Sequence, residues 1–365
     1  MSESLEGFLR QHPRYRFDGV RASVPMSPAS LNARDLFIER FGLRDPLEEQ
    51  DCFLCGRREF EPLSEIDRYG FYYPTGWCRN CGNVQQTAYY DERVVAQFYE
   101  GYYRAIYDHR DPRELFESQR DGVAPRIHRF VSAVGRPRSV LEVGCGAGGI
   151  LAHFRDRGCS VTGLDFDERF LEVARDQGIE VHAVDVAEFD PQRRFDCILL
   201  SHVVEHIVDP VEFLVTIRSR LTRDGLLYVE VPSLNQVRAG GYCFDLLRYY
   251  QNAHTAHYSR ATLENLAFLS GFDVAEADDF IRSVWTPRDR RGTLDPARTA
   301  RSREETTRLI LGAERDRRSL RGALALARHH TRRLLVAGLS AVRLEPAARR
   351  VYRAVRDRLG SGPRS

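Results

Sequence analysis

A glycine-rich turn between an apolar strand and an apolar helix is the first place in this 365-residue chain where a ligand would meet bare backbone. The stretch SVLEVGCGAGGIL, residues 139–151, contains Gly144, Gly146, Gly148 and Gly149. Turns of this kind let a ligand approach the start of a helix closely, and three of these glycines fit the GxGxxG spacing. A nicotinamide dinucleotide and S-adenosylmethionine both suit such a turn, so the glycines alone leave the ligand open.

Three carboxylates at the ends of successive predicted strands favour the sulfonium cofactor. Glu142 stands two residues before Gly144, where an acid would repel a pyrophosphate but suits the ammonium group of a methionine moiety. Asp165 ends the second strand, where a carboxylate can accept hydrogen bonds from the ribose hydroxyls of either cofactor. Asp185 ends the third strand, where an acid can accept from the adenine amino group. We therefore expect a cofactor that carries no phosphate.

Four histidines after the fourth and fifth predicted strands supply the candidate base. His202 and His206 lie in SHVVEHIVDP, and His254 and His257 lie in NAHTAHYS. If the acceptor is a hydroxyl its proton must leave, and histidine titrates near neutral pH. We assign His206 as the catalytic base and His254 and His257 as acceptor contacts; the alternative is that these side chains only hydrogen-bond their loops. His254 and His257 could also bind a metal, but the sequence shows no third ligand.

Two CxxC pairs form a second candidate site. Four thiolates in two knuckles match the tetrahedral coordination of zinc, at a spacing close to that of zinc ribbons. Because sulfur would occupy all four positions, we expect structural Zn²⁺ and not a catalytic ion. A pair of disulfides is the alternative, although persistent disulfides are uncommon in cytosolic proteins. The expected ligands are Cys52, Cys55, Cys78 and Cys81.

The elements that position these residues alternate between strand and helix five times. This alternation predicts an α/β fold, a Rossmann-like doubly wound and mainly parallel sheet with helices on both faces. The predicted strands are 139–144, 160–165, 180–185, 195–201 and 225–232, with a further strand at 272–280.

Composition and pattern divide the chain into five segments. A small zinc-binding unit and a tyrosine-rich helical segment precede the α/β domain, and an Arg-rich helical tail follows it. The predicted segments are a partly ordered leader (1–50), a zinc-binding module (51–90), a helical connector or lid (91–135), the α/β domain (136–285), and a linker with the tail (286–365).

The α/β segment resembles the class I S-adenosylmethionine-dependent methyltransferases over about residues 120–275. EVGCGAG matches their acid followed by GxGxG, the acids at 165 and 185 match those that end their second and third strands, and SHVVEHIVDP matches a stretch that many members carry. The resemblance implies that S-adenosylmethionine is bound by Glu142, Gly144, Gly146, Gly148, Asp165, Asp185, Val186, Ser201 and His202.

A zinc knuckle followed by the tyrosine-rich stretch FYEGYYRAIYD resembles the sugar methyltransferases that act on nucleotide-linked deoxysugars. In that family these parts lie over the cofactor and shape the acceptor pocket, which makes Tyr102, Tyr103 and Tyr107 acceptor-side candidates. The C-methylating members usually carry Glu-His where this chain has Ala253-His254, and a helical tail cannot replace their second nucleotide-binding-like domain. We therefore expect O-methylation of a sugar or similar hydroxyl, with C-methylation as the alternative.

Charge distribution narrows the choice of partners. The net charge is only +2, but residues 301–365 carry 17 Arg against 6 acids. The chain contains Arg and no Lys, which indicates a compositional bias of the genome. Any one Arg cluster is therefore weaker evidence for a binding site. The tail is expected to pack on the catalytic domain or on a second copy in a homodimer; peripheral contact with an anionic membrane is the alternative.

The remaining composition favours a cytoplasmic enzyme with a small-molecule or glycan acceptor. The sequence shows no apolar run long enough for a membrane span and no apolar region of a secretory signal. Residues 51–100 hold eight acids against five Arg, which disfavours nucleic acid as the partner. An RNA methyltransferase and a non-catalytic cofactor-binding regulator stay as the two alternative functions.

Overall fold

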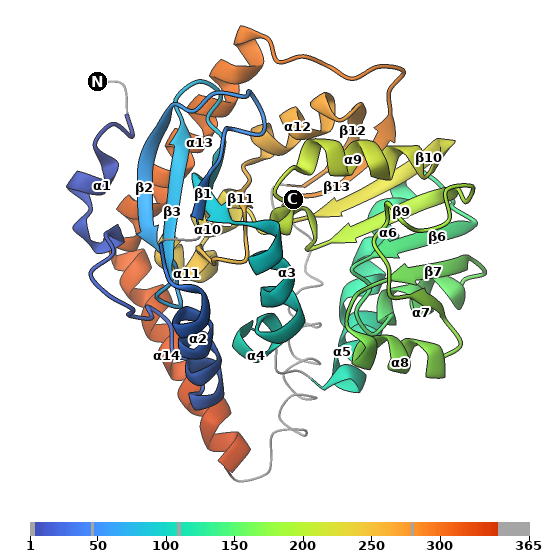
Figure 1. Cartoon of the computed structure of the whole chain (residues 1–365), viewed down its shortest axis with the longest axis horizontal. Helices are drawn as coiled ribbons and strands as arrows, with labels where there is room; N and C mark the ends of the chain where they lie inside the picture. The colour runs from blue at the N-terminus through green and yellow to red at the C-terminus, as the bar shows by residue number, and fades with distance from the viewer. Residues whose placement is uncertain (1–3, 45–46, 108–110, 279–280, 342–365) are drawn as a thin grey trace.

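A seven-stranded sheet with helices packed around it makes up one part of the protein (Figure 1). The computed structural model describes residues 4–44, 47–107, 111–278 and 281–341. Five strands of this sheet run parallel, and the two strands at one edge are joined through antiparallel pairs, in the order β12-β13-β10-β9-β6-β7-β8. The strands are β6 (Ser139–Val143), β7 (Ser160–Leu164), β8 (Glu180–His182), β9 (Phe195–Ser201), β10 (Leu221–Glu230), β12 (Phe272–Ala277) and β13 (Arg282–Pro287).

The predicted parallel core is present, and two details differ from the sequence prediction. β8 ends at His182, so Asp185 lies three residues beyond the strand and not at its end. β13 was not predicted, because it is a short strand that ends in proline and lies at the border of the segment assigned to the linker. Its partners explain its formation, since it pairs antiparallel with both β10 and β12.

Helices cover both faces of the sheet, and successive residues of each strand enter different cores. In β9, Ile198 and Leu200 pack with one face, while Cys197 and Leu199 pack with the other. Asp209 begins one of the helices by accepting a hydrogen bond from a backbone N–H of the first turn. The helices are α6 (Ala124–Val134), α7 (Gly149–Arg155), α8 (Glu168–Asp176), α9 (Pro210–Ser219) and α12 (Arg260–Leu269), with α5 (Pro112–Ser118) and the π-helical turn η2 (Gln119–Val123) leading into α6.

A second sheet joins the cysteine-bearing segment to the α/β domain. Its order is β11-β4-β3-β2, so the strand at one edge comes from a part of the chain about 170 residues downstream of the others. Ala256 pairs with Gln85 and His257 with Val84. The strands are β2 (Phe60–Ile66), β3 (Tyr72–Cys78), β4 (Val84–Gln86) and β11 (Ala256–His257).

The leader is more ordered than the sequence indicates. Leu5, Phe8, Tyr15 and Phe37 are each no more than 2% exposed, because the leader helices pack against the second sheet and the connector. The connector helices lie between the two sheets (Figure 1). These elements are α1 (Phe8–Gln11), η1 (Pro13–Tyr15), α2 (Pro28–Phe41), the paired strands β1 (Leu47–Glu49) and β5 (Ala88–Tyr90), α3 (Glu92–Gly101) and α4 (Tyr103–Tyr107).

Short helical segments follow β9 and β10. The segment after β9 is η3 (Val204–His206), and the chain between β10 and β11 forms α10 (Leu234–Arg238), η4 (Gly241–Phe244) and α11 (Leu246–Tyr249).

The first helix of the C-terminal segment begins inside the predicted linker. α13 (Pro296–Arg317) starts where Asp295 accepts from the backbone N–H of Arg298, with proline at the first helical position. It packs on the cysteine-bearing segment, where Ser302 Oγ donates to the carbonyl of Cys81 at 2.6 Å. α14 (Leu320–Ala341) follows, and the rest of the predicted Arg-rich tail lies outside the described residues. None of the described helices is long and apolar enough to cross a bilayer.

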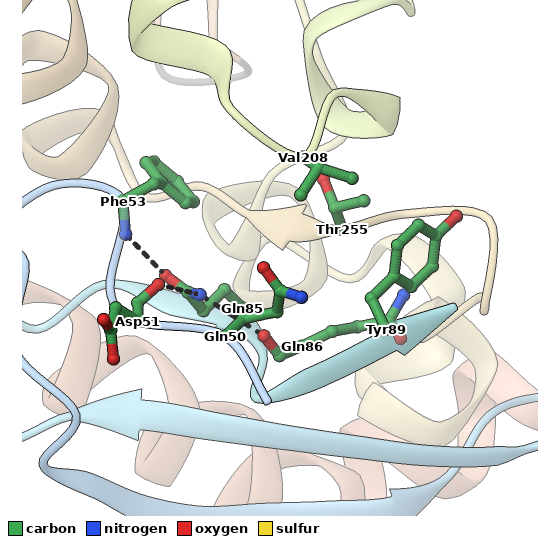
Figure 2. A pocket seen from close by; sticks show the side chains of 8 residues that line it. All are labelled: Gln50, Asp51, Phe53, Gln85, Gln86, Tyr89, Val208 and Thr255. Atoms are coloured by element: carbon green, nitrogen blue, oxygen red, sulfur yellow. Dashed lines mark hydrogen bonds between the residues drawn. The ribbon is translucent and has the colours of Figure 1, made fainter. Parts of the chain in front are cut away.

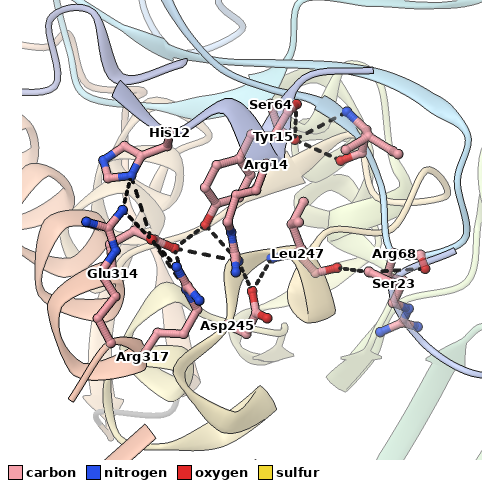
Figure 3. Close-up of polar contacts among 12 residues, drawn as sticks. His12, Arg14, Tyr15, Ser23, Ser64, Arg68, Asp245, Leu247, Glu314 and Arg317 are labelled. Carbon is pink, nitrogen blue, oxygen red and sulfur yellow. Dashed lines mark hydrogen bonds and ion pairs between the residues drawn. The ribbon is translucent and has the colours of Figure 1, made fainter. Parts of the chain in front are cut away.

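A buried ion network fastens the leader to α13 (Figure 3). The Glu314 carboxylate is 3% exposed and accepts a hydrogen bond from the Tyr15 hydroxyl. Arg14 and Arg317 place guanidinium nitrogens 3.6 and 3.2 Å from it. Burial alone would raise the pKa of Glu314, but these partners lower it. The N-terminal leader is thus held by one carboxylate from the other end of the described chain.

Replacing this carboxylate should therefore destabilise the whole protein. Glu314→Ala removes the buried carboxylate that the Tyr15 hydroxyl, Arg14 and Arg317 share and leaves Arg14 with Asp245 as its acidic partner, so we expect a loss of about 3 kcal/mol in the free energy of unfolding. Urea unfolding followed by circular dichroism measures it. The matched control is Glu304→Ala, an exposed position on the same helix, which should shift stability by less than about 0.5 kcal/mol. Equal stability of the two variants would contradict the assignment.

Candidate functional site

The glycine turn after β6 is held against the end of β7. Gly144, Gly146 and Gly148 have φ angles of 71°, 53° and 77°, a region that glycine enters without strain. The backbone N–H of Gly144 donates to the carbonyl of Leu164 at 2.8 Å, and that of Gly146 donates to Asp165 Oδ2 at 2.8 Å. The turn and the Asp165 carboxylate therefore form one unit at the carboxyl edge of the sheet.

Glu142 lies beneath this turn with an unused acceptor. Its side chain is 1% exposed, and its Oε2 atom is buried with no hydrogen-bond partner among the described residues. Burial raises the pKa of Glu142 well above its usual range, and the nearby Asp165 raises it further. A buried carboxylate oxygen without a donor fits a ligand that brings a positive charge and an N–H group.

The later glycines of the turn are explained by helix packing. A Cβ at Gly148 would lie 3.0 Å from the Cβ of Ala174 on α8. A Cβ at Gly149 would lie 2.1 Å from the carbonyl oxygen of Phe116 on α5. A ligand contact is therefore not needed to account for glycine at position 148.

The other predicted cofactor residues lie along the same edge of the sheet. Asp185 is exposed and accepts from the N–H of Ala187 at 2.8 Å, while Val186 beside it is buried. Ser201 ends β9, and His202 follows it with a φ of 60° and a side chain that is 54% exposed. The structure thus brings together the edge positions that the sequence assigned to the cofactor.

His206 is held in one orientation directly after β9. Its Nδ1 atom lies 2.8 Å from the carbonyl oxygen of Ala253 and 3.0 Å from the Tyr99 hydroxyl. Because a carbonyl only accepts, Nδ1 carries the hydrogen and Nε2 of the neutral ring carries a lone pair. Burial lowers the pKa of His206, which favours this neutral form.

His254 and Glu205 complete a buried cluster around His206. The imidazole rings of His206 and His254 lie 5.0 Å apart, edge to face. The Glu205 carboxylate is 1% exposed, and its Oε1 atom lies 4.0 Å from His206 Nε2. Burial, followed by the neighbouring His206, lowers the pKa of His254 well below its usual value. These three side chains come from two separate loops.

His257 lies in the core of the second sheet, with its ring 6.2 Å from that of His254, and its assignment as an acceptor contact stays a prediction. Its side chain is fully buried, its Nε2 atom lies 2.7 Å from the Tyr73 hydroxyl, and burial lowers its pKa to about 3. The rings of Tyr249 and Tyr250 pack 4.9 and 4.8 Å from it. The cause is β11, whose pairing with β4 turns His257 into the core of the second sheet.

Backbone hydrogen bonds to β4 and to the segment after β9 hold the loop that carries His254. Thr255 donates its N–H to the carbonyl of Glu205 at 2.7 Å, and its own carbonyl accepts from the N–H of Gln86 at 2.9 Å. The Gln86 side chain donates to the carbonyls of Asn252 and His254 at 2.9 and 3.1 Å. Figure 2 shows Gln86 and Thr255 facing each other across a small hollow at this junction.

The glutamine side chains that line this hollow already form hydrogen bonds within the fold. Gln85 accepts from the N–H of Phe53 at 3.2 Å and donates to the carbonyl of Asp51 at 3.0 Å (Figure 2). Since the amide groups of both glutamines serve the fold, we interpret the hollow as part of the junction and not as a ligand site.

Tyrosines of the connector face the histidine cluster in part. Tyr103 lies 5.9 Å from the His206 ring, whereas Tyr102 packs on Phe37 of the leader at 5.3 Å. Tyr107 donates to the side chain of Asn252. Of the three predicted acceptor-side tyrosines, only Tyr103 therefore has its ring beside that of His206, in an edge-to-face arrangement.

Two site residues were missed by sequence reasoning. Tyr99 lies four residues before Tyr103, the spacing that puts two side chains on one helical face, and this signal could have indicated it. Glu205 was quoted in the Glu-His stretch but received no role, because nothing in the local sequence shows which side chains will surround it.

The four cysteines of the knuckles converge as predicted. Their sulfur atoms lie within 4.8 Å of one another, with Cys52 to Cys81 at 3.4 Å and Cys55 to Cys78 at 3.6 Å. A disulfide would bring two sulfurs to about 2.05 Å. Tetrahedral coordination with metal–sulfur bonds of about 2.3 Å separates them by roughly 3.8 Å, close to the distances seen.

Comparison with known proteins identifies the central domain. Residues 108–277 match the family model of a methyltransferase domain, which confirms that expectation. A ubiquinone biosynthesis O-methyltransferase of Bradyrhizobium diazoefficiens is 35% identical over 113 residues, covering 29% of this chain and 44% of the relative. An (S)-tetrahydroprotoberberine N-methyltransferase of Eschscholzia californica is 29% identical over 102 residues, covering 26% and 29%. The chain thus spans less than half the length of these relatives.

A solved structure also matches. The 1,6-didemethyltoxoflavin-N1-methyltransferase of Burkholderia thailandensis, with bound 1,6-didemethyltoxoflavin and S-adenosylhomocysteine, is 19% identical with a TM-score of 0.37, covering 54% of this chain and 86% of that one.

A buried aspartate anchors the His254 loop from the side of the second sheet. Asp67 is fully buried and accepts from the N–H groups of Tyr69, Phe71 and Asn252 at 2.8 to 2.9 Å. Burial outweighs these hydrogen bonds and raises the pKa of Asp67 from 3.8 to about 6. The folded protein therefore binds a proton here more tightly than the unfolded chain does.

This raised pKa predicts a definite pH dependence of stability. As pH rises from about 3 to about 7, the contribution of Asp67 to the free energy of unfolding should fall by about 3 kcal/mol. Asp67→Asn cannot titrate and should lack that slope, whereas the exposed control Asp176→Asn should keep it. Urea unfolding of the three proteins across this range measures the difference. Parallel pH profiles for wild type and Asp67→Asn would show that the aspartate does not carry the effect.

Proposed function

We propose that this protein transfers a methyl group from S-adenosylmethionine to an oxygen atom of a small-molecule acceptor, with a sugar hydroxyl as the preferred class. The observation that carries the proposal is the buried, donorless oxygen of Glu142 beneath the glycine turn, at the same sheet edge as the histidine cluster. The match to a methyltransferase domain supports it.

The cofactor would occupy the carboxyl edge of β6, β7 and β8. Its ammonium group would satisfy the free oxygen of Glu142, and its ribose hydroxyls would donate to Asp165. Asp185 and Val186 would border the adenine, with Ser201 and His202 near the methionine portion. A pyrophosphate fits this edge poorly, because it brings no cation that would favour the buried Glu142 carboxylate.

The chemical step is a direct displacement. The acceptor oxygen attacks the methyl carbon, the new oxygen–carbon bond forms as the carbon–sulfur bond breaks, and S-adenosylhomocysteine leaves. The hydroxyl proton passes to a base, for which Nε2 of His206 carries the lone pair, and the net proton is released to solvent. Alignment of the two reactants supplies most of the acceleration.

The acceptor would lie beside the connector helices. Tyr103 offers an aromatic surface 5.9 Å from His206, and Tyr99 holds that ring through its hydroxyl. Aromatic faces pack against the apolar faces of sugar rings and against phenolic rings alike. One relative is named as an O-methyltransferase of ubiquinone biosynthesis, so a phenolic hydroxyl is the competing acceptor.

We also infer that the four cysteines hold a structural zinc ion. Four sulfur ligands close its coordination, so the ion would add stability and leave no position for substrate. Its place in the fold gives it a second effect, because the same segment supplies β4, which orders the His254 loop.

Cofactor binding is tested first at Glu142. Glu142→Gln should weaken S-adenosylmethionine binding by about 10- to 100-fold, because it removes a charged hydrogen bond worth about 1.5–3 kcal/mol. Binding to wild type should release a proton, since the ammonium group favours the carboxylate over the neutral acid. Isothermal titration calorimetry in two buffers of different ionisation enthalpy measures both effects.

The exposed Glu188→Gln is the matched control and should bind like wild type. Tight binding of NAD or NADP with no response to S-adenosylmethionine would overturn the assignment.

Turnover identifies the acceptor. Production of S-adenosylhomocysteine should appear with nucleotide-linked deoxysugars or related glycans, and His206→Gln should lower turnover by at least tenfold while leaving cofactor affinity unchanged. Turnover only with phenols or quinols, only with structured RNA, or at a carbon atom would replace the sugar-hydroxyl assignment. Cofactor binding with no turnover on any of them would favour the non-catalytic regulator.

Metal removal tests the role of the cysteine cluster. Metal analysis should find zinc, and Cys55→Ser should lose it, lower the melting temperature and speed hydrogen exchange at residues 252–257. Cys243→Ser, which lies outside the cluster, should change none of these. Zinc loss without faster exchange in that loop would contradict the proposed link between the two sites.

A further inference from the structure

Two buried side chains and one half-buried side chain of metal-binding type converge at the end of β9. Glu205, His206 and His254 each place one nitrogen or oxygen atom within 4.8 Å of the other two. Glu205 Oε2 and His254 Nδ1 are both buried with no hydrogen-bond partner among the described residues. The structure therefore leaves polar atoms unsatisfied at one point, which is costly unless something binds there.

The hydrogen of His206 points away from the cluster. The hydrogen of His206 is used on Nδ1 by the Ala253 carbonyl at 2.8 Å, so its Nε2 atom faces the cluster as an acceptor. The other carboxylate oxygen, Glu205 Oε1, is 3.3 Å from Nδ1 of the exposed His202. The centre of the cluster thus presents the lone pair of His206 Nε2, a carboxylate of Glu205 and the imidazole of His254, whose Nδ1 atom has no partner among the described residues.

The backbone around the cluster fixes these side chains from both sides. Thr255, the residue after His254, donates its backbone N–H to the carbonyl of Glu205 at 2.7 Å. Its hydroxyl donates to the carbonyl of Ile207 at 2.6 Å. Tyr99 and the Ala253 carbonyl hold the His206 ring from the opposite side. Preorganised ligands of this kind are what a metal site requires.

We propose that Glu205, His206 and His254 bind a divalent transition-metal ion at a site distinct from the four-cysteine cluster. Two imidazoles and one carboxylate suit Zn²⁺, Co²⁺ or Fe²⁺ and leave coordination positions open. All four cysteine sulfurs lie in their own cluster, so the two sites differ in ligand chemistry as well as in place. The sequence supplied His206 and His254, and the fold supplies the third ligand.

The ion would also deepen the proposed function, and its catalytic role depends on that function being correct. An acceptor hydroxyl bound at an open position would lose its proton to solvent more readily, because the cation lowers the pKa of a coordinated oxygen. With the ion bound, Nε2 of His206 would be a ligand, and the ion would supply the activation of the hydroxyl that the metal-free protein assigns to His206 as base. An acceptor with two neighbouring oxygens, a vicinal diol or a catechol, would fit two open positions.

Cobalt binding tests the site without any substrate. The full chain is first loaded with one equivalent of zinc, which the four thiolates bind in preference, and is then titrated with Co²⁺ while visible absorption is recorded. We expect d–d bands of low-coordinate cobalt with no sulfur-to-metal charge-transfer band in the near ultraviolet. Glu205→Gln and His254→Gln should each weaken this binding by at least tenfold.

Matched controls keep the result interpretable. His182→Gln, at a half-buried histidine on β8 outside the cluster, should bind cobalt like wild type. Circular dichroism confirms the fold of each variant, and the melting temperature gives a second readout, since an ion that binds only the folded state should raise it for wild type and not for the triad variants.

The outcomes separate this inference from the proposed function. Absence of such bands, or equal binding by wild type and both triad variants, would overturn the metal site. Methyl transfer that persists unchanged after chelation would do so as well, while leaving the methyltransferase assignment intact. Cobalt binding at the triad in a protein that ignores S-adenosylmethionine would keep the site and refute the function.

Discussion

The pairing of a two-residue strand, β11, with β4 is the constraint on which the rest of this structure depends. It completes the second sheet with residues 256–257 of the α/β domain. Thr255 extends the connection, since it is bonded on one side to Gln86 and on the other to Glu205. A single backbone segment therefore joins the cysteine-bearing unit to the carboxyl end of β9, where the proposed chemistry takes place.

This joint explains why polar groups are buried where they are. Asp67 holds Asn252, Gln86 holds the carbonyls on either side of Ala253, and the Ala253 carbonyl in turn orients His206. Buried polar networks are stabilising only when their members are satisfied. The outer members of this network have hydrogen-bond partners, but Glu205 Oε2 and His254 Nδ1 at its centre have none among the described residues. Glu142 Oε2 under the glycine turn also lacks a partner among them. Both gaps favour ligands that bring positive charge.

Much of the fold followed from the sequence because its signals are local. Alternating apolar strands and amphipathic helices predicted the parallel core, and the glycine turn with its acids predicted the cofactor edge. The CxxC spacing predicted the cysteine cluster. β13 was missed because its formation depends on pairing with β10 and β12, which no local pattern reveals.

The details of the site depend on contacts between distant segments, and those were not predictable. His254 and His257 are three residues apart and looked equivalent, yet pairing of β11 with β4 buries one in the second sheet and leaves the other in the cluster. Glu205 belongs to the cluster because the loop that carries His254 packs beside it. Residues of the leader, Tyr15 above all, became structural through Glu314, which is about 300 residues away in the chain.

A crystal structure with S-adenosylhomocysteine bound would test the proposed site in a single measurement. We predict that the amino group of the ligand lies at Glu142 Oε2, its ribose at Asp165, and its sulfur directed toward Glu205, His206 and His254. A ligand bound elsewhere, or one whose sulfur points away from the histidine cluster, would contradict this arrangement.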